Sequence, residues 1–339
     1  MPADGLTVAV TGPTGDLGVA VVGALHRSRQ VKLIVGMARS PFDPAAEGWR
    51  KVEYRQGDVQ DRASVADAVK GADVVVHLAF AILTAGEATR SVNVEGSRTV
   101  FEEAVKAGAD RICYASSVAA YGFHDDNPEW LDEDVPARGS DAHPYSAQKA
   151  EVERVLATVL KGRRKTTAWV FRPPIIAGPR AQTLLDEIPY VRLSERMPDA
   201  VVRLLDLMPA LKPVLPDPGT PFQLVHEDDV ASAFLAGVLG KGEPGAYNIA
   251  PKDHITVSDL ADAMGWYSVP VPDLAVDVTA EIVQRMPGLP DVASWVESVR
   301  RPVLLRTDRA QKVLKWKPRY SSRETLKALV DARRAEDVY

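Results

Sequence analysis

Residues 11–18 read T-G-P-T-G-D-L-G and separate a segment that predicts a strand from one that predicts a helix. Residues 6–10, just before them, form an uncharged apolar run, which is typical of a buried parallel strand. After them, apolar side chains recur at helical spacing, at Leu17, Val21, Val22 and Leu25. The glycines therefore occupy a strand-to-helix turn, where dinucleotide-binding loops are found.

Each glycine of this loop has a predicted task. Gly12 allows a tight turn, Gly15 lets backbone N–H groups approach a pyrophosphate, and Gly18 lets the helix pack close to the strand. The helix N-terminus then faces the phosphate charge. Three neighbouring residues complete the predicted cofactor contacts of the loop: Thr14, Asp16 and Leu17. A plain strand-to-helix turn is the alternative, because glycine-rich turns are common.

Length and composition are those of a globular protein with one large or two modest domains. The 339 residues are 46% hydrophobic and 26% charged, and a net charge of -5 gives no reason to expect nucleic acid or an anionic membrane as partner. A single cysteine, Cys113, excludes an internal disulfide. Residues 1–5 lack the features of a secretory signal, and the apolar residues 200–215 are too short and too polar to span a membrane. We expect a cytoplasmic protein.

Strand-like runs alternate with helical patterns from residue 6 to residue 172, which predicts an α/β fold with a Rossmann-like, doubly wound parallel sheet. Residues 1–172 are the predicted dinucleotide-binding domain, and residues 222–250 return to it. The expected strands cover residues 6–10, 31–35, 52–55, 73–78, 111–114, 167–171, 222–225 and 246–249. The expected helices in this part cover residues 63–69, 92–107, 146–160 and 228–239.

A smaller, irregular lobe is predicted for residues 173–221 and 251–339. It would cover the open end of the sheet, where folds of this class bind their substrates. Two closing helices are expected over residues 307–314 and 322–334, with Ser322 as the N-cap of the second.

The end of the second strand favours NADP(H) over NAD(H), which stays possible. An NAD site usually places a carboxylate there for the ribose 2′-hydroxyl, whereas this chain has Ala38 followed by Arg39, which suits a 2′-phosphate. A solvated surface arginine is the alternative.

Two further strand ends are predicted to line the cofactor. Asp58 and Val59 follow the third strand and are expected near the adenine, unless Asp58 only caps the helix from Asp61. The small Ala79 lets the backbone at the end of the fourth strand run against the dinucleotide, together with its neighbours Leu78 and Phe80.

Tyr145 and Lys149 lie four residues apart at the start of a helical pattern, so their side chains share one helix face. A lysine ammonium near a phenol lowers the tyrosine pKa from about 10, so that the phenol exchanges a proton with a substrate oxygen near neutral pH. Ser116 and Ser117 follow an apolar strand, where catalytic groups of such sheets lie. A chance surface pair and turn-forming serines are the alternatives.

These motifs, in this order, resemble the extended short-chain dehydrogenase/reductase family, also called the NAD-dependent epimerase/dehydratase family. The resemblance covers nearly the whole chain. Besides the glycine-rich loop and Asp58 it rests on V-V-V-H-L-A ending at Ala79, N-V-E-G at 93–96, S-S-V-A-A-Y-G at 116–122, Y-S-A-Q-K at 145–149, F-R-P-P at 171–174, G-P at 178–179, V-H-E-D-D-V at 225–230 and W-K-P at 316–318.

The resemblance implies Ser117, Tyr145 and Lys149 as the catalytic residues. Tyr145 would be the acid/base and Ser117 would position the substrate oxygen. Lys149 would hold the nicotinamide ribose and lower the tyrosine pKa, and Ser116 would contact cofactor or substrate.

Other residues receive supporting roles from the same resemblance. The chain from Pro173 through Ile175 and Ile176 would run past the carboxamide of the cofactor. Asn93 would be structural or support a water near the lysine. Two charged residues would hold the fold rather than catalyse, namely Arg172 and Asp229.

Departures from the family narrow the function. Val118 and Ala119 stand where dehydratases carry an Asp-Glu pair, and Ala38-Arg39 replaces the acid of NAD-retaining epimerases. The sequence favours an NADP(H)-dependent oxidoreductase that transfers a hydride between nicotinamide and a carbonyl or secondary-alcohol carbon of a small molecule. A nucleotide-sugar epimerase with retained NAD is the alternative, for which arginines of the lobe would grip the diphosphate: Arg180, Arg192, Arg196 and Arg203. A non-catalytic redox-sensing module is the third possibility.

The histidines and two of the predicted helices indicate what to expect of metal binding and of partners. None of the six histidines has a Cys, Asp or Glu at ligand spacing in a supporting context, so we expect no metal. The helices over 92–107 and 146–160 resemble those that the family pairs into a four-helix interface, which would make a homodimer. Val100, Val155 and Val159 would then lie in the interface, unless they face the sheet.

Overall fold

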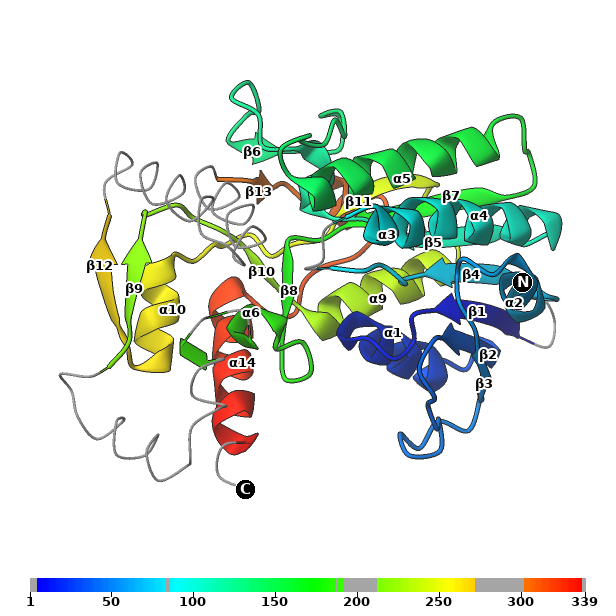
Figure 1. The fold of residues 1–339 in the computed structure, drawn as a ribbon, viewed down its shortest axis with the longest axis horizontal. Coiled ribbons are helices and arrows are strands. Elements are labelled where there is room, and N and C mark those ends of the chain that lie inside the picture. The colour runs from blue at the N-terminus through cyan, green and yellow to red at the C-terminus, as the bar shows by residue number, and fades with distance from the viewer. Residues whose placement is uncertain are drawn as a thin grey trace.

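Seven parallel strands form the central sheet of the computed structural model, which describes residues 5–82, 86–186, 188, 190–191, 212–271 and 302–336. Their order is β11-β7-β5-β4-β1-β2-β3 (Figure 1). The strands are β1 (Leu6–Thr11), β2 (Val31–Ala38), β3 (Val52–Gln56), β4 (Val74–His77), β5 (Arg111–Ala115), β7 (Thr167–Arg172) and β11 (Gly245–Asn248). The strand order reverses between β1 and β4, as in a Rossmann fold, so the predicted fold class is confirmed.

Helices cover both faces of this sheet (Figure 1). One face packs against α1 (Asp16–Arg27) and α9 (Glu227–Val238), and the other packs against α2 (Arg62–Val69), α4 (Gly96–Lys106) and α5 (Pro144–Leu160). Side chains of a strand alternate between the two cores: Val8 and Val10 lie in the first, and Ala9 lies in the second. A strand buried on both faces has no polar side, which explains the uncharged run that precedes the glycine-rich loop.

The predicted helix over residues 92–107 is divided into two parts and follows a further short helix. A short helix, α3 (Glu87–Arg90), leads into a π-helical segment over Ser91–Glu95, and α4 continues from Gly96. Val100 and Val155 are buried in the core between the sheet and α4 and α5, and Val159 packs against that core. Val100 and Val155 therefore face the sheet, and the interface role considered for them is wrong.

The described part of the lobe is more regular than the sequence predicts. β8 (Ile175–Ala177) pairs with β10 (Leu224–His226), and β9 (Val214–Asp217) pairs with β12 (Tyr267–Pro270). These strands are three or four residues long, so their pattern is too short to show a period. The predicted strand over 222–225 thus joins β8 rather than the central sheet. The remaining elements are β6 (Trp130–Leu131), which pairs with β13 (Leu304–Leu305), and the helices α6 (Thr183–Asp186), α10 (Val257–Met264), α13 (Asp308–Lys312) and α14 (Ser322–Glu336).

The N-cap of α14 is one residue earlier than predicted. Ser321 Oγ accepts the Glu324 N–H at 3.1 Å, and the Glu324 carboxylate accepts the Ser321 N–H at 2.8 Å, which is a capping box. Ser322 is buried, and its hydroxyl instead bonds the backbone of Leu224 and of Asp253. Arg192, Arg196, Arg203 and most of residues 200–215 lie outside the described residues.

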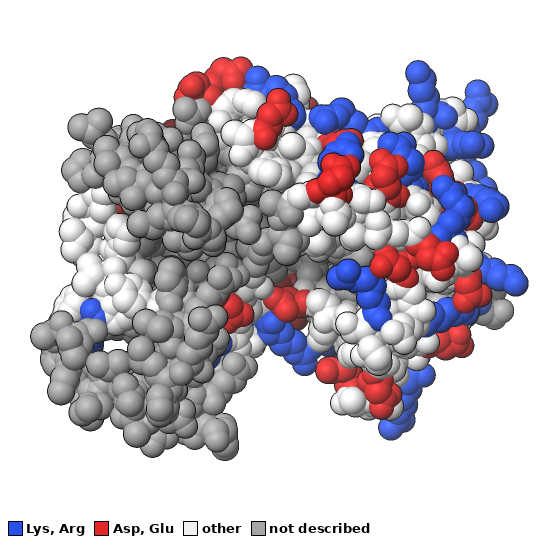
Figure 2. Space-filling model, in the orientation of Figure 1, with Lys and Arg blue, Asp and Glu red and all other residues white. Residues whose placement is uncertain are grey.

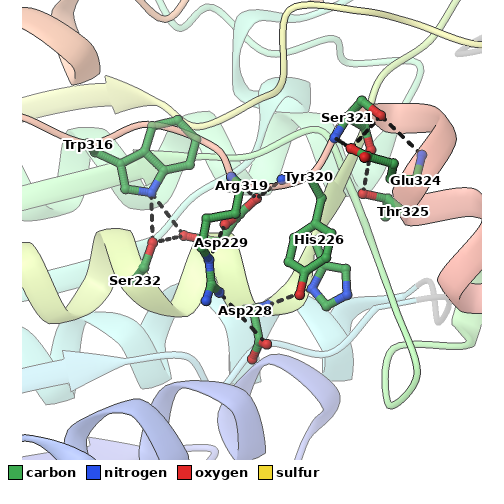
Figure 3. A network of polar contacts seen from close by, with 10 residues as sticks. All are labelled: His226, Asp228, Asp229, Ser232, Trp316, Arg319, Tyr320, Ser321, Glu324 and Thr325. Atoms are coloured by element: carbon green, nitrogen blue, oxygen red, sulfur yellow. Dashed lines mark hydrogen bonds and ion pairs between the residues drawn. The ribbon is translucent and has the colours of Figure 1, made fainter.

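Asp229 of α9 anchors the segment that leads to α14 (Figure 3). Its fully buried carboxylate accepts the N–H groups of Arg319 and Tyr320 at 2.8 and 3.0 Å, and the Arg319 Nε at 3.0 Å. The Trp316 indole donates to the Asp229 carbonyl at 3.0 Å. The His226 ring stacks on Tyr320 with centroids 4.0 Å apart. Asp229 therefore holds the fold, as the resemblance implied.

The sheet half of the molecule carries charges of both signs, interspersed over the face shown in Figure 2. Many are paired, as in Arg62 with Glu102 at 2.6 Å and Arg98 with Glu95 at 3.1 Å. Within the described ranges, none of the helices is long and apolar enough to cross a membrane.

Candidate active site

The glycine-rich loop is built as a tight cradle at the end of β1. Gly12 has φ +72°, and a Cβ on it would lie 2.8 Å from the Ala79 backbone nitrogen. A Cβ on Gly18 would lie 2.1 Å from the Gly12 carbonyl oxygen. Gly15 is exposed and caps the N-terminus of α1, so the side of the loop that would meet a pyrophosphate is open. Gly12 and Gly18 require glycine for the reasons that the sequence suggested, whereas Gly15 has room for a Cβ, and its contact with a pyrophosphate stays a prediction.

Replacing Gly18 with alanine should abolish dinucleotide binding, because the new methyl group would force the loop and α1 apart. Titration with NADPH should show no saturation. Gly23→Ala is the matched control: it lies on the same helix, and its Cβ would meet only the movable Arg27 guanidinium, at 3.3 Å. That variant should bind normally and gain up to about 1 kcal/mol of unfolding free energy. Normal binding by Gly18→Ala would contradict the close packing.

A cavity of about 530 Å³ lies beside this loop, between α1 and the lobe. Thr14 and Asp16 line it together with Arg180, Thr183 and Arg333. The Asp16 carboxylate accepts the Thr183 hydroxyl at 2.9 Å, so its side chain is turned toward the lobe. Neither Ser117, Tyr145 nor Lys149 borders this cavity.

The end of β2 presents Arg39 to solvent. Among the described residues, no hydrogen bond or ion pair engages its guanidinium. Its backbone is held instead, because Gln56 Nε2 donates to the Arg39 carbonyl at 2.8 Å and the Tyr54 hydroxyl donates to the Ala38 carbonyl at 2.9 Å. An anchored backbone with an uncommitted cationic side chain is a suitable arrangement for an anion such as a 2′-phosphate.

Asp58 does not cap α2. That cap is Asp61, whose carboxylate accepts the N–H groups of Ala63 and Ser64, both at 3.2 Å. The Asp58 carboxylate accepts the Gln60 N–H within its own turn, at 2.9 Å. The alternative role of Asp58 as a helix cap is therefore wrong, whereas its placement near an adenine stays a prediction, as does that of the buried Val59.

The end of β4 is supported by a buried polar chain. His77 bonds Thr11 Oγ1 at 2.7 Å and Ser97 Oγ at 2.8 Å, and burial lowers its pKa to about 3, so the ring is neutral. Asn93 accepts the Ala81 N–H at 2.7 Å and donates to the Gln148 side chain at 2.7 Å. These bonds connect the segment after Phe80 to α5. Asn93 therefore has the structural role, which was one of the two roles considered for it.

Ser117, Tyr145 and Lys149 come together where β5 ends against α5. The Ser117 hydroxyl lies beside the Tyr145 phenol and favours its ionisation. Lys149 is buried, donates to the Ala115 carbonyl at 2.8 Å, and has its Nζ 5.6 Å from the centroid of the Tyr145 ring. The Phe80 ring lies 3.6 Å from the same Nζ, a cation–π contact, and meets Tyr145 edge-on.

Burial has the largest effect on the pKa values of Tyr145 and Lys149. It raises the pKa of Tyr145, and the neighbouring Ser117 hydroxyl only opposes the rise. It lowers the pKa of Lys149 to about 7, against the attraction of Glu153. The predicted lowering of the tyrosine pKa is therefore not observed, because removal from water disfavours both the phenolate and the ammonium.

Ser116 faces α5, and a contact with cofactor or substrate stays a prediction for it. Its buried hydroxyl donates to Glu153 at 2.5 Å, and the same carboxylate pairs with Arg172 at 2.5 Å. Arg172 is thus a fold-holding ion-pair partner, as expected. Glu153 was missed by the sequence analysis, although it lies four residues after Lys149 and hence on the same helix face.

The chain after β7 passes beside this group. The Pro173 carbonyl accepts the Val118 N–H at 2.9 Å, so Pro173 lies next to the residues that follow Ser117. Ile175 and Ile176 in β8 are half-buried. Among the described residues no group of three or more His, Cys, Asp or Glu side chains is arranged to hold a metal ion.

A glycine cradle at the first strand-to-helix turn and a Ser-Tyr-Lys group at the end of β5 define an α/β protein of the dinucleotide-binding dehydrogenase type. The family model described as "NAD dependent epimerase/dehydratase family" matches residues 8–250, and the chain belongs to this family. Its members and relatives include dehydrogenases, epimerases and dehydratases, so the chain is an enzyme of this NAD(P)-dependent class.

Two curated relatives and one solved structure illustrate the range of the family. The chain is 33% identical to sterol demethylase protein B of Methylococcus capsulatus over 181 residues, which are 51% of this chain and 52% of that protein. It is 32% identical to human 3 beta-hydroxysteroid dehydrogenase type 7 over 202 residues, 54% of each protein. The matches thus span about half the length of these relatives. MoeE5 in complex with UDP-glucuronic acid and NAD has a similar fold, with a TM-score of 0.69 at 19% identity, covering 98% of this chain and 100% of that one.

Proposed function

We propose that the protein is an NADP(H)-dependent oxidoreductase that transfers a hydride between nicotinamide and a carbonyl or secondary-alcohol carbon of a small molecule. The observation that carries this proposal is that Ser117 and Tyr145 lie beside the buried Lys149, at the same edge of the sheet as the glycine cradle. The names of two relatives, a sterol demethylase protein and a 3 beta-hydroxysteroid dehydrogenase, support a largely apolar alicyclic substrate.

The residues present fit a dinucleotide. Gly12 and Gly18 form a cradle that a Cβ would fill, and the exposed Gly15 opens the N-terminus of α1 to a pyrophosphate. Arg39 would hold a 2′-phosphate, and Lys149 would hold the nicotinamide ribose. When bound, NADP(H) supplies or accepts the hydride.

The chain's own residues handle the proton. Ser117 would orient the substrate oxygen by a hydrogen bond, and Tyr145 would exchange the proton with that oxygen. Because burial raises the pKa of Tyr145, the phenol stays protonated near neutral pH. The protonated phenol is the form that donates to a carbonyl oxygen, so reduction is the direction that this geometry favours.

The cofactor preference is tested by titration of the purified protein with NADPH and NADH, after release of any retained nucleotide by denaturation. We expect an empty protein that binds NADPH more tightly. Arg39→Ala should weaken the binding of NADPH at least tenfold, which corresponds to about 1.4 kcal/mol, and leave the affinity for NADH unchanged. Arg29→Ala removes the same charge at the opposite end of β2 and should change neither affinity. Equal loss for both cofactors in Arg39→Ala would overturn the phosphate role.

A nucleotide-sugar epimerase is the second candidate, and the shared fold of MoeE5 with its UDP-glucuronic acid and NAD favours it. This function requires a tightly retained cofactor and a diphosphate nucleotide sugar. Stoichiometric NAD in the denatured supernatant would therefore support the epimerase over the reductase. The homodimer and the cytoplasmic location stay predictions from the sequence.

A further inference from the structure

Glu153 lies one helical turn beyond Lys149 on α5, and three donors converge on its carboxylate. The Ser116 hydroxyl donates to Oε1 at 2.5 Å, and Arg172 donates through Nε at 2.9 Å and through Nη2 at 2.5 Å. The side chains of Glu153 and Arg172 are 12% and 7% exposed. A carboxylate so far from water persists only with such partners.

These contacts join three elements at the predicted site. Ser116 directly follows β5, Arg172 is the last residue of β7, and Glu153 belongs to the helix that carries Tyr145 and Lys149. Ser117, which lies beside the Tyr145 phenol, is the neighbour of Ser116. The carboxylate therefore fixes the end of β5 relative to the helix face on which proton exchange is proposed.

Glu153 is also the negatively charged group among the titratable side chains that face Lys149. The titratable groups that face this lysine are Glu153 and Tyr145 on α5, Tyr114 on β5, whose ring centroid is 5.4 Å from Nζ, and His77 on β4. Burial raises the pKa of both tyrosines and lowers that of His77, so these three side chains are neutral near pH 7. Arg172 is the ion-pair partner of Glu153.

We propose that Glu153 is a positioning residue of the hydride-transfer site, which holds Ser116 and thereby Ser117 in place and supplies the counter-charge for the Lys149 ammonium. The inference deepens the proposed function and rests on it for its catalytic meaning. The contacts of Glu153 themselves do not depend on which reaction the protein performs.

The negative charge of Glu153 determines the direction in which its removal shifts the pKa of Lys149. A negative carboxylate favours the protonated lysine, so its removal lowers the pKa of Lys149, which already lies near 7. Glu153→Gln keeps an amide oxygen for Ser116 and removes the charge. The Lys149 ammonium should then lose its proton at a pH lower by on the order of one unit. The alkaline limb of the reduction rate should move by the same amount.

The direct readout is a ¹³C NMR titration of protein labelled at the lysine Cε, with the Lys149 signal assigned by its loss in Lys149→Met. Glu151→Gln is the matched control: it lies on the same helix and pairs with Arg90 at 2.5 Å. The Lys149 midpoint should fall in Glu153→Gln and stay unchanged in Glu151→Gln. Glu153→Asp, which keeps the charge, should restore the midpoint and part of kcat.

A second variant keeps the test possible if Glu153→Gln does not fold, because Glu153→Gln leaves the Arg172 charge buried without its partner. Glu153→Gln/Arg172→Gln removes both charges and should show the same lowered midpoint. An unchanged midpoint in a folded double variant would overturn the counter-charge role, whatever the activity. A lowered midpoint in a protein that transfers no hydride from NADPH or NADH would keep this role and refute the proposed function.

Discussion

Tyr145→Phe should lower turnover at least a hundredfold while leaving NADPH affinity within about twofold of the unchanged protein. The phenol is the proposed proton donor, and positioned acid/base groups contribute roughly 10²–10⁴ to the rate. A hundredfold loss corresponds to about 2.7 kcal/mol of barrier. The ring itself remains, so its edge-on contact with Phe80 and the packing around Lys149 should persist.

The measurement is steady-state reduction of a panel of alicyclic ketones with NADPH, with fluorescence titration of the cofactor in parallel. Tyr247→Phe is the control: it deletes a hydroxyl from a different tyrosine, which is buried on β11 and donates to the Glu243 carbonyl. That variant should keep its turnover. Near-normal turnover in Tyr145→Phe would show that another group moves the proton.

Asp229→Ala should lower the free energy of unfolding by about 3 kcal/mol. The carboxylate is fully buried and satisfies the backbone N–H groups of both Arg319 and Tyr320. Each buried donor left without an acceptor costs about 1–3 kcal/mol. The Arg319 guanidinium adds little to this figure, because its side chain is 58% exposed and water screens its charge.

Urea unfolding followed by circular dichroism measures this loss, and the midpoint should fall without a large change in slope. Asp228→Asn is the matched control on the preceding residue. Its carboxylate is 40% exposed and 3.7 Å from the Arg319 guanidinium, so the change should cost less than about 1 kcal/mol. If both variants lost the same stability, the anchoring role drawn in Figure 3 would be wrong.

The two variants separate function from stability. Asp229 lies in the first turn of α9, which packs on the opposite face of the sheet from α5, and it holds the segment between Trp316 and Tyr320. Purified Asp229→Ala, assayed below its unfolding midpoint, should therefore retain cofactor binding. Tyr145→Phe should show the reverse pattern, with normal stability and lost turnover.

Local sequence patterns determined much of this protein. The uncharged run before Gly12 and the helical spacing after Gly18 placed the cradle correctly, because both features depend on residues close together in the chain. The four-residue spacing of Tyr145 and Lys149 put both on one face of α5, since helix geometry alone requires it. The alternation of strands and helices was sufficient for the parallel sheet.

Tertiary structure alone decided how the site is charged and supported. Ser116 and Arg172 reach Glu153 across 37 and 19 residues of sequence, and no local pattern reports such a pairing. A local pattern does not report burial either. Burial raises the pKa of Tyr145, whereas the sequence suggested a lowered pKa. Desolvation depends on the atoms that all neighbouring elements bring around a group, and these come together only in the folded chain.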